Sequence, residues 1–127
     1  MTKSLTEKIE VSVETKFEEI RLISKQRQFI FSYQIRIDNH SQTSVKLLSR
    51  HWFIFDSRSH YSEVKGDGVV GEQPLIEAGS SYSYESFCQL QSDMGMMWGT
   101  YLMRNEDERL IEVKIPEFEL IVPYRLN

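Results

Sequence analysis

The sequence predicts an all-β domain: an immunoglobulin-like or fibronectin type III-like antiparallel β-sandwich of about seven strands. In most of its hydrophobic stretches, every second residue is apolar, which is the period of a strand with one buried face. Turn-forming residues separate these stretches, and no window keeps a convincing 3.6-residue period over the length of a helix. The single cysteine, Cys88, excludes an intramolecular disulfide, so packing alone has to hold the two sheets together.

The expected strands follow one another along the chain with polar turns between them. They fall within residues 8–15, 28–38, 44–55, 80–90, 96–103 and 109–122. The second of these stretches, QFIFSYQIRID, alternates most cleanly, with Phe29, Phe31, Tyr33, Ile35 and Ile37 on one face. The turn signals are DNHSQTS, DSRSH, EAG, SDMG and RNEDER.

One segment, residues 14–25, is ambiguous. Phe17, Ile20 and Ile23 can form one short helical face. We expect it to be extended or a loop.

Length and composition indicate one domain over residues 1–127, with an ordered core of about residues 7–124. The chain is 40% hydrophobic and carries a net charge of −4, which disfavours a nucleic-acid binder because such proteins usually carry a basic excess. Arg21, Lys25 and Arg27 form a local basic cluster, which is more often a solvated loop edge than a binding patch.

The expected location is the cytoplasm. The first ten residues contain no apolar signal-peptide core, and no apolar run approaches the length of a membrane span, so no membrane association is expected. A lone thiol stays reduced in the cytoplasm.

Half of the six glycines lie in VKGDGVVGEQPLI, residues 64–76, where Gly66, Gly68 and Gly71 form the pattern G-x-G-x-x-G. A dinucleotide-binding loop needs a helix that opens at the third glycine. Pro74 and Gly79 leave no room for that helix, and no Gly-Lys-Ser/Thr follows for a nucleoside-triphosphate loop.

Two interpretations of this loop remain open. Its backbone N–H groups can turn inward and bind an anion, with Lys65 adding positive charge and Asp67 opposing it. Alternatively, the glycines supply positive φ in a tight connection, with Val69 and Val70 in the core. The candidate ligand-binding residues are Lys65, Gly66, Asp67, Gly68, Val69, Val70 and Gly71.

Nothing in the sequence predicts catalysis, a metal site or a cofactor. Cys88 lies in an expected strand, far in sequence from any histidine, and is interpreted as a small buried apolar residue. His51 and His60 flank an expected hairpin and can approach each other across it, although surface histidines there are more common than a metal site. The acidic tip Glu106–Glu108 is interpreted as a solvated turn rather than a cation site.

Aromatic residues are numerous enough to suggest an interaction surface. Tyr82, Tyr84, Trp98 and Tyr101 lie on neighbouring expected strands, where they form either core and cross-strand pairs or an exposed binding surface. The apolar end ELIVPYRLN can pair as an edge strand with a partner or with a second copy, giving a homodimer.

Over about residues 7–124 the sequence resembles the ApaG family of small bacterial proteins. The matching features are Arg50, Trp52 and Ile54 in one strand and the long glycine motif Glu63–Gly79. They continue with Tyr82, Tyr84 and Ser86, then Gly95, Met97, Gly99, Tyr101 and Met103, and finally Ile115–Pro123. Together they are far more specific than the three glycines alone.

The resemblance implies an immunoglobulin-like sandwich without an established enzymatic activity. Family members are associated by phenotype with cobalt resistance and magnesium efflux, and related domains in larger eukaryotic proteins are linked to protein binding. The glycine motif of the family has been proposed to bind pyrophosphate-type ligands, which here places that role on Gly66, Gly68 and Gly71. We therefore expect a non-enzymatic protein-binding module, or alternatively a sensor of pyrophosphate or a nucleoside polyphosphate.

Overall fold

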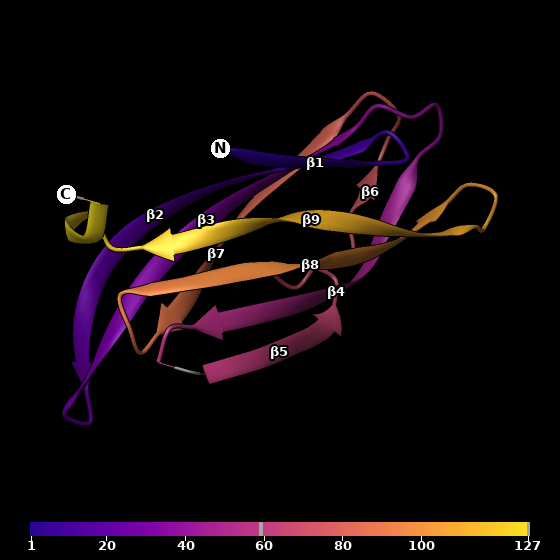
Figure 1. Cartoon of the computed structure of the whole chain (residues 1–127). Coiled ribbons are helices and arrows are strands. Elements are labelled where there is room, and N and C mark those ends of the chain that lie inside the picture. The colour runs from indigo at the N-terminus through magenta and orange to yellow at the C-terminus, as the bar shows by residue number, and fades with distance from the viewer. Residues whose placement is uncertain (59, 127) are drawn as a thin grey trace.

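The computed structural model describes residues 1–58 and 60–126, apart from the side chains of residues 125 and 126. Two antiparallel sheets pack face to face (Figure 1), which confirms the predicted β-sandwich. The first sheet has the order β1 (Thr2–Thr6), β2 (Ile9–Ile23), β3 (Gln26–Asn39), β7 (Ser81–Leu90). The second has the order β5 (His60–Asp67), β4 (Val45–Asp56), β8 (Met94–Asn105), β9 (Leu110–Ile121), and β6 (Leu75–Ile76) also pairs with β4. A short 3-10 helix, Pro123–Leu126, follows β9.

The core lies between the sheets and is built from the alternating residues that the sequence indicated. In β3 the five alternating residues Phe29, Phe31, Tyr33, Ile35 and Ile37 are buried, while Gln34 and Arg36 are exposed. Trp52 of β4 reaches across to the first sheet, where its ring centroid lies 5.5 Å from that of Tyr33. Because aromatic rings bury a large apolar area and pair edge to face, contacts of this kind hold the sheets without a disulfide.

The predicted number of about seven strands was too low. The described residues contain nine strands, and β1, β5 and β6 were not among the expected stretches. β1 is mostly exposed, and its residues Ser4 and Thr6 bond the backbone of Lys114 in β9, with Ser4 Oγ 2.6 Å from the carbonyl oxygen. β5 is exposed along nearly its whole length. Neither strand buries a regular apolar face, so neither leaves a period-two signal.

The ambiguous residues 14–25 are extended, as expected, and the helical alternative is wrong. β2 continues to Ile23 and pairs with β3 along its length. The register shifts between Phe17 and Glu19, and this bulge places Phe17 and Ile20 opposite Phe31 and Phe29 on the same face. The extra residue in the bulge therefore produced the three-residue spacing between Phe17 and Ile20, whereas Ile23 lies on the opposite face from Ile20.

The β2–β3 hairpin projects beyond the other strands at one end of the molecule, and the β8–β9 hairpin lies at the opposite end (Figure 1). RNEDER forms the tip of the β8–β9 hairpin, as predicted. Within the described residues no helix is long and apolar enough to cross a membrane.

Candidate functional site

The glycine loop runs from the end of β5 through a two-residue turn towards β6. Val69 N–H donates to the carbonyl oxygen of Glu72 at 2.8 Å, and Glu72 N–H donates back to Val69 at 3.0 Å. The two residues between them, Val70 and Gly71, have φ values of 47° and 79°. Positive φ at both central positions is the pattern of a type I′ hairpin turn.

Each glycine of the motif has a structural reason to be glycine. A Cβ on Gly66 would lie 2.9 Å from the guanidinium carbon of Arg50, so its absence makes room for that side chain. Gly68 has a φ of 61°, and a Cβ there would lie 2.0 Å from the carbonyl oxygen of Glu72. Gly71 supplies the second positive φ of the turn.

The loop directs carbonyl groups, not free amides, towards its interior. Gly68 N–H donates to the carbonyl oxygen of Leu48 at 2.8 Å, and the Val69 amide is used in the turn. Arg50 Nη1 donates to the carbonyl oxygens of Asp67 at 3.0 Å and Gly68 at 2.9 Å. The chain's own cation therefore occupies the inner side of the loop, and the amides of Gly68 and Val69 are not available to an anion.

The other loop residues divide between core and solvent. Val69 is fully buried, as expected, but Val70 lies at the tip of the turn with 63% of its surface exposed, so its expected place in the core was wrong. The side chains of Lys65 and Asp67 are exposed. This geometry favours the structural interpretation of the glycines.

His51 and His60 do not approach each other across the β4–β5 hairpin, which agrees with the interpretation as surface histidines. His51 pairs in register with Lys65 and His60 pairs with Asp56, which separates them by five positions along the β4–β5 hairpin. His51 Nε2 instead lies 3.2 Å from the Glu63 carboxylate.

A different group of potential ligands lies on the outer face of the first sheet. Among the described residues, Glu10, Asp38 and His40 are the only group of three whose ligand atoms all lie within 4.8 Å of one another. Arg36 Nε already contacts Asp38 at 2.9 Å, and His40 Nε2 lies 3.4 Å from Glu10. Desolvation raises the pKa of Asp38, but hydrogen bonds from Ser81 and Arg36 and the Arg36 charge outweigh it, so the pKa is lowered overall. We interpret the group as cross-strand ion pairs.

The acidic tip makes contacts of its own. Glu106 accepts a hydrogen bond from the Ser44 amide at 3.0 Å, and Glu108 lies 3.5 Å from Arg104. These contacts are those of a solvated hairpin tip.

Cys88 is buried, as interpreted from the sequence. Desolvation, together with the negative charge of Asp56, raises the pKa of its thiol to about 12. Because the thiolate is the nucleophilic form, a buried thiol that stays protonated is unsuited to covalent catalysis.

The four aromatic residues considered for a surface are separated by the fold. Tyr101 is fully buried, and its hydroxyl is hydrogen-bonded to that of Tyr84. Desolvation raises the pKa of both hydroxyls. Tyr82 is partly exposed on β7 and donates to Glu72 at 3.1 Å. Only Trp98 lies on the outer side of the second sheet.

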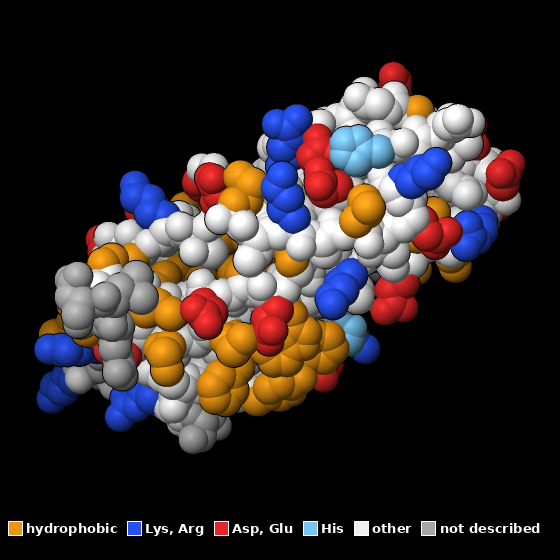
Figure 2. Space-filling view, turned by 45° about the horizontal axis from the view of Figure 1, so that its top comes forward, with side chains coloured by type: hydrophobic (Ala, Val, Ile, Leu, Met, Phe, Trp, Pro, Cys, Tyr) orange, Lys and Arg blue, Asp and Glu red, His pale blue; other side chains and the backbone are white. Residues whose placement is uncertain are grey.

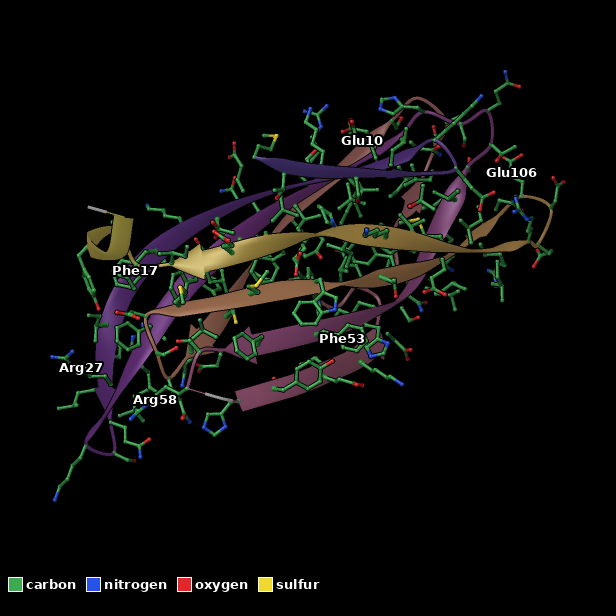
Figure 3. The ribbon with its side chains drawn as sticks, viewed as in Figure 1. Glu10, Phe17, Arg27, Phe53, Arg58 and Glu106 are labelled. Atoms are coloured by element: carbon green, nitrogen blue, oxygen red, sulfur yellow. The ribbon has the colours of Figure 1, made fainter. Side chains whose placement is uncertain are left out.

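Trp98 belongs to a cluster that the sequence did not reveal, which we call the aromatic face: His51, Phe53, Tyr61 and Trp98. Phe53 and Trp98 are direct cross-strand neighbours, stacked with ring centroids 5.8 Å apart. Tyr61 of β5 lies 6.1 Å from Trp98 and 6.4 Å from Phe53, and the His51 ring lies 4.3 Å from Phe53. Figure 2 shows the hydrophobic patch that results on this side of the molecule, and Figure 3 labels Phe53 within it.

The aromatic face is open to solvent and adjoins a free sheet edge. Tyr61 is 58% exposed and the neighbouring Phe55 is 39% exposed. Among the residues that the structure describes, β5 pairs with β4 on one side only, so its other edge presents unpaired backbone groups. The signal in the sequence was the run WFIF, which places apolar residues on both faces of one strand, although a sandwich strand needs only one.

The chain matches the model of the ApaG domain over residues 20–105. It is 42% identical over 123 residues to Protein ApaG of Brucella suis, covering 97% of this chain and 95% of that protein. Its structure is similar to the X-ray structure of a Northeast Structural Genomics Consortium target (TM-score 0.88, 38% identity, 91% of this chain and 88% of the other). It is also similar to the crystal structure of the putative ApaA protein from Bordetella pertussis (TM-score 0.84, 38% identity, 91% and 94% covered). With a family model matched over most of its length and a relative of this identity over nearly all of it, the chain belongs to the ApaG family.

Proposed function

We propose that this protein is a non-enzymatic binding module that recruits a partner protein through the aromatic face and the free edge of β5. The observation that carries the proposal is the open cluster of Phe53, Tyr61 and Trp98. Tyr, Trp and Phe are enriched at the centres of protein interfaces, where a few such residues supply most of the binding energy. An unpaired strand beside them adds main-chain hydrogen-bonding groups that a partner strand can use.

Two features support binding rather than catalysis. The one thiol, Cys88, is buried and remains protonated at neutral pH. The imidazoles of His40 and His51 lie beside the carboxylates of Glu10 and Glu63, and within the described residues no hydroxyl or thiol is hydrogen-bonded to either imidazole. Nucleophilic catalysis needs a nucleophile bonded to its base, and neither imidazole has one.

The association of the family with cobalt and magnesium fits the same proposal indirectly. A module that carries no cation itself can act on cation levels by binding a transporter or a regulator of one. We propose that the partner of this protein is such a transporter or regulator. The partner's identity then decides the physiological effect.

The test is affinity capture from a bacterial lysate of a host that encodes an ApaG protein, with quantitative mass spectrometry. Tyr61→Ala removes an exposed ring from the aromatic face, and Phe87→Ala removes a ring that is 61% exposed on β7 of the other sheet. We expect a specific partner to be lost with Tyr61→Ala and retained with Phe87→Ala. Equal recovery by both variants would contradict the proposal, and size-exclusion chromatography with light scattering shows whether a second copy is the partner.

The ligand-sensor alternative is tested separately. An amide-resolved NMR titration with pyrophosphate, ATP and diadenosine tetraphosphate, without and then with Mg²⁺ or Co²⁺, monitors Gly66, Gly68 and Gly71. Because the amides of Gly68 and Val69 are already bonded, the binding-module proposal expects no saturable shifts there. Saturable shifts confined to the loop would favour the sensor instead.

A further inference from the structure

A second surface, at the end of the molecule where the β2–β3 hairpin projects, has the properties of a binding site. A hollow of about 590 Å³ lies under the tip of the β2–β3 hairpin, at the end where that hairpin outreaches the other strands. We call it the end hollow; its lining includes Lys25, Arg27, Phe29, Arg58, Gln91 and Tyr124. Figure 3 places the labelled side chains of Arg27 and Arg58 at this end, although they come from β3 and from the turn that follows β4.

Beside the end hollow, the tip of the β2–β3 hairpin presents an apolar, uncovered face. Ile20 pairs in register with Phe29, and Leu22 pairs with Arg27, so all four share one face of the hairpin. Phe29 is part of the core, which identifies this face as the inner face of the first sheet. Ile20 and Leu22 are nevertheless 44% and 74% exposed. They occupy core-side positions that the second sheet does not cover.

The polar side of the end hollow carries cations without anionic partners. Lys25, Arg27 and Arg58 line it, and none of the three forms an ion pair with the part of the chain that the structure describes. Other arginines behave differently, since Arg21 and Arg36 each contact a carboxylate. The one acidic residue in the lining, Asp93, accepts a hydrogen bond from the Tyr124 hydroxyl at 2.9 Å. The end hollow is thus locally basic on a chain whose net charge is −4.

We propose that the end hollow binds an acidic segment of a partner protein, in which Asp or Glu residues flank aliphatic ones. Such a segment matches both halves of the site, because its carboxylates meet the unpaired cations while its apolar side chains cover Ile20 and Leu22. A phosphate would satisfy the cations and leave the aliphatic side chains exposed to water.

The probe is a fluorescein-labelled short peptide in which Glu alternates with Leu, followed by fluorescence anisotropy and by amide-resolved NMR. We expect saturable binding that weakens with added salt, with shifts at the amides of residues 20–27 and at Arg58. The same peptide with Gln in place of Glu should lose binding, because the cations would no longer meet charge.

The decisive variant is Arg27→Glu with Arg58→Glu, matched by Lys65→Glu with Lys114→Glu on the second sheet. Both pairs change the net charge equally, all four side chains lie on the surface, and neither control lysine forms an ion pair within the described residues. An exposed ion pair contributes up to about five-fold to affinity, and reversing a cation replaces that attraction with a repulsion, so reversing two cations should weaken binding by about tenfold. The control pair should weaken it much less.

Three results would overturn the proposal: no peptide binding at millimolar concentration, equal losses in the two variant pairs, or the same amide shifts with pyrophosphate alone. Sedimentation with phosphatidylglycerol vesicles that depends on Arg27 and Arg58, without peptide binding, would assign the surface to a membrane instead. Tyr61→Ala should leave peptide binding unchanged. The end-hollow proposal and the aromatic-face proposal can therefore fail independently of each other.

Discussion

At the scale of single residues, Val70 is a β-branched residue in a left-handed backbone conformation, with φ of 47° at the exposed tip of the glycine loop. β-Branched residues rarely adopt positive φ, and a left-handed non-glycine residue costs on the order of 1–3 kcal/mol. The turn chemistry that suits the geometry is Asn-Gly, and the chain has Val-Gly.

Val70→Asn should therefore raise the free energy of unfolding by about 1 kcal/mol, because Asn tolerates the left-handed region and completes the preferred turn pair. Urea unfolding followed by circular dichroism measures the change. Val64→Asn is the matched control, since Val64 is also exposed but lies in β5, where a β-branched residue is favoured. A loss of stability in Val70→Asn as large as in Val64→Asn would show that the turn is not strained.

At the scale of elements, the end of β4 is joined to the β7–β8 turn by one buried carboxylate. Asp56 Oδ2 accepts the Gln91 amide at 2.6 Å, and its Oδ1 accepts the Ser92 hydroxyl and the Arg58 amide. Asp56 is 6% exposed, so removing the carboxylate leaves these donors unsatisfied in a site that water reaches poorly.

Asp56→Ala is expected to cost roughly 2–4 kcal/mol of stability, because hydrogen bonds to charged groups are stronger than neutral ones and buried unpaired donors add a desolvation penalty. The free energy of unfolding from urea titration is the readout. Asp67→Ala removes an exposed carboxylate from the same sheet and should change stability by less than about 0.5 kcal/mol. Equal losses of stability in Asp56→Ala and Asp67→Ala would mean that the hydrogen bonds between Asp56 and the β7–β8 turn do not stabilise the fold.

The β2–β3 hairpin combines a stable base with an unsupported tip. Residues 31–37 of β3 are buried at alternate positions between β2 and β7, whereas residues 20–27 lie beyond β7 and are exposed. Few buried contacts mean a low local opening free energy. In hydrogen exchange, the amides of residues 20–23 should exchange at least about tenfold faster than those of residues 31–37, and equal protection would show that the tip is as stable as the core.

At the scale of the whole molecule, the sandwich could be predicted because its core strands bury one face and so leave a period of two in the sequence. The clean alternation of β3 and the polar tip between β8 and β9 are examples. The edge strands could not be predicted, since β1 and β5 bury no regular face. The run WFIF indicated a second apolar face on β4, but the cluster on it could not be predicted, because Phe53, Tyr61 and Trp98 are brought together only by the β4–β5 and β4–β8 pairings.

The sandwich also buries acids that the unfolded chain can ionise. Burial raises the pKa of the Cys88 thiol to about 12 and raises the pKa values of the Tyr84 and Tyr101 hydroxyls. In the unfolded chain these groups lose their protons near their ordinary pKa values, about 8.5 for Cys and about 10 for Tyr. Above those values the unfolded state binds fewer protons than the folded state, so the free energy of unfolding falls as pH rises.

The stability contributed by the protonated Cys88 thiol is therefore fully present below about pH 8.5 and is lost progressively up to about pH 12, where the folded thiol ionises. Urea unfolding at several pH values between 7 and 10.5 should show the decline. Cys88→Ala removes this titrating thiol, but it also lowers stability at neutral pH by opening a cavity. The quantity to compare is therefore the slope of the free energy of unfolding against pH. Between pH 9 and 10 the variant should lose on the order of 1 kcal/mol less per pH unit than the wild type. Parallel curves would contradict the prediction, because they would mean that the thiol titrates alike in the folded and unfolded states.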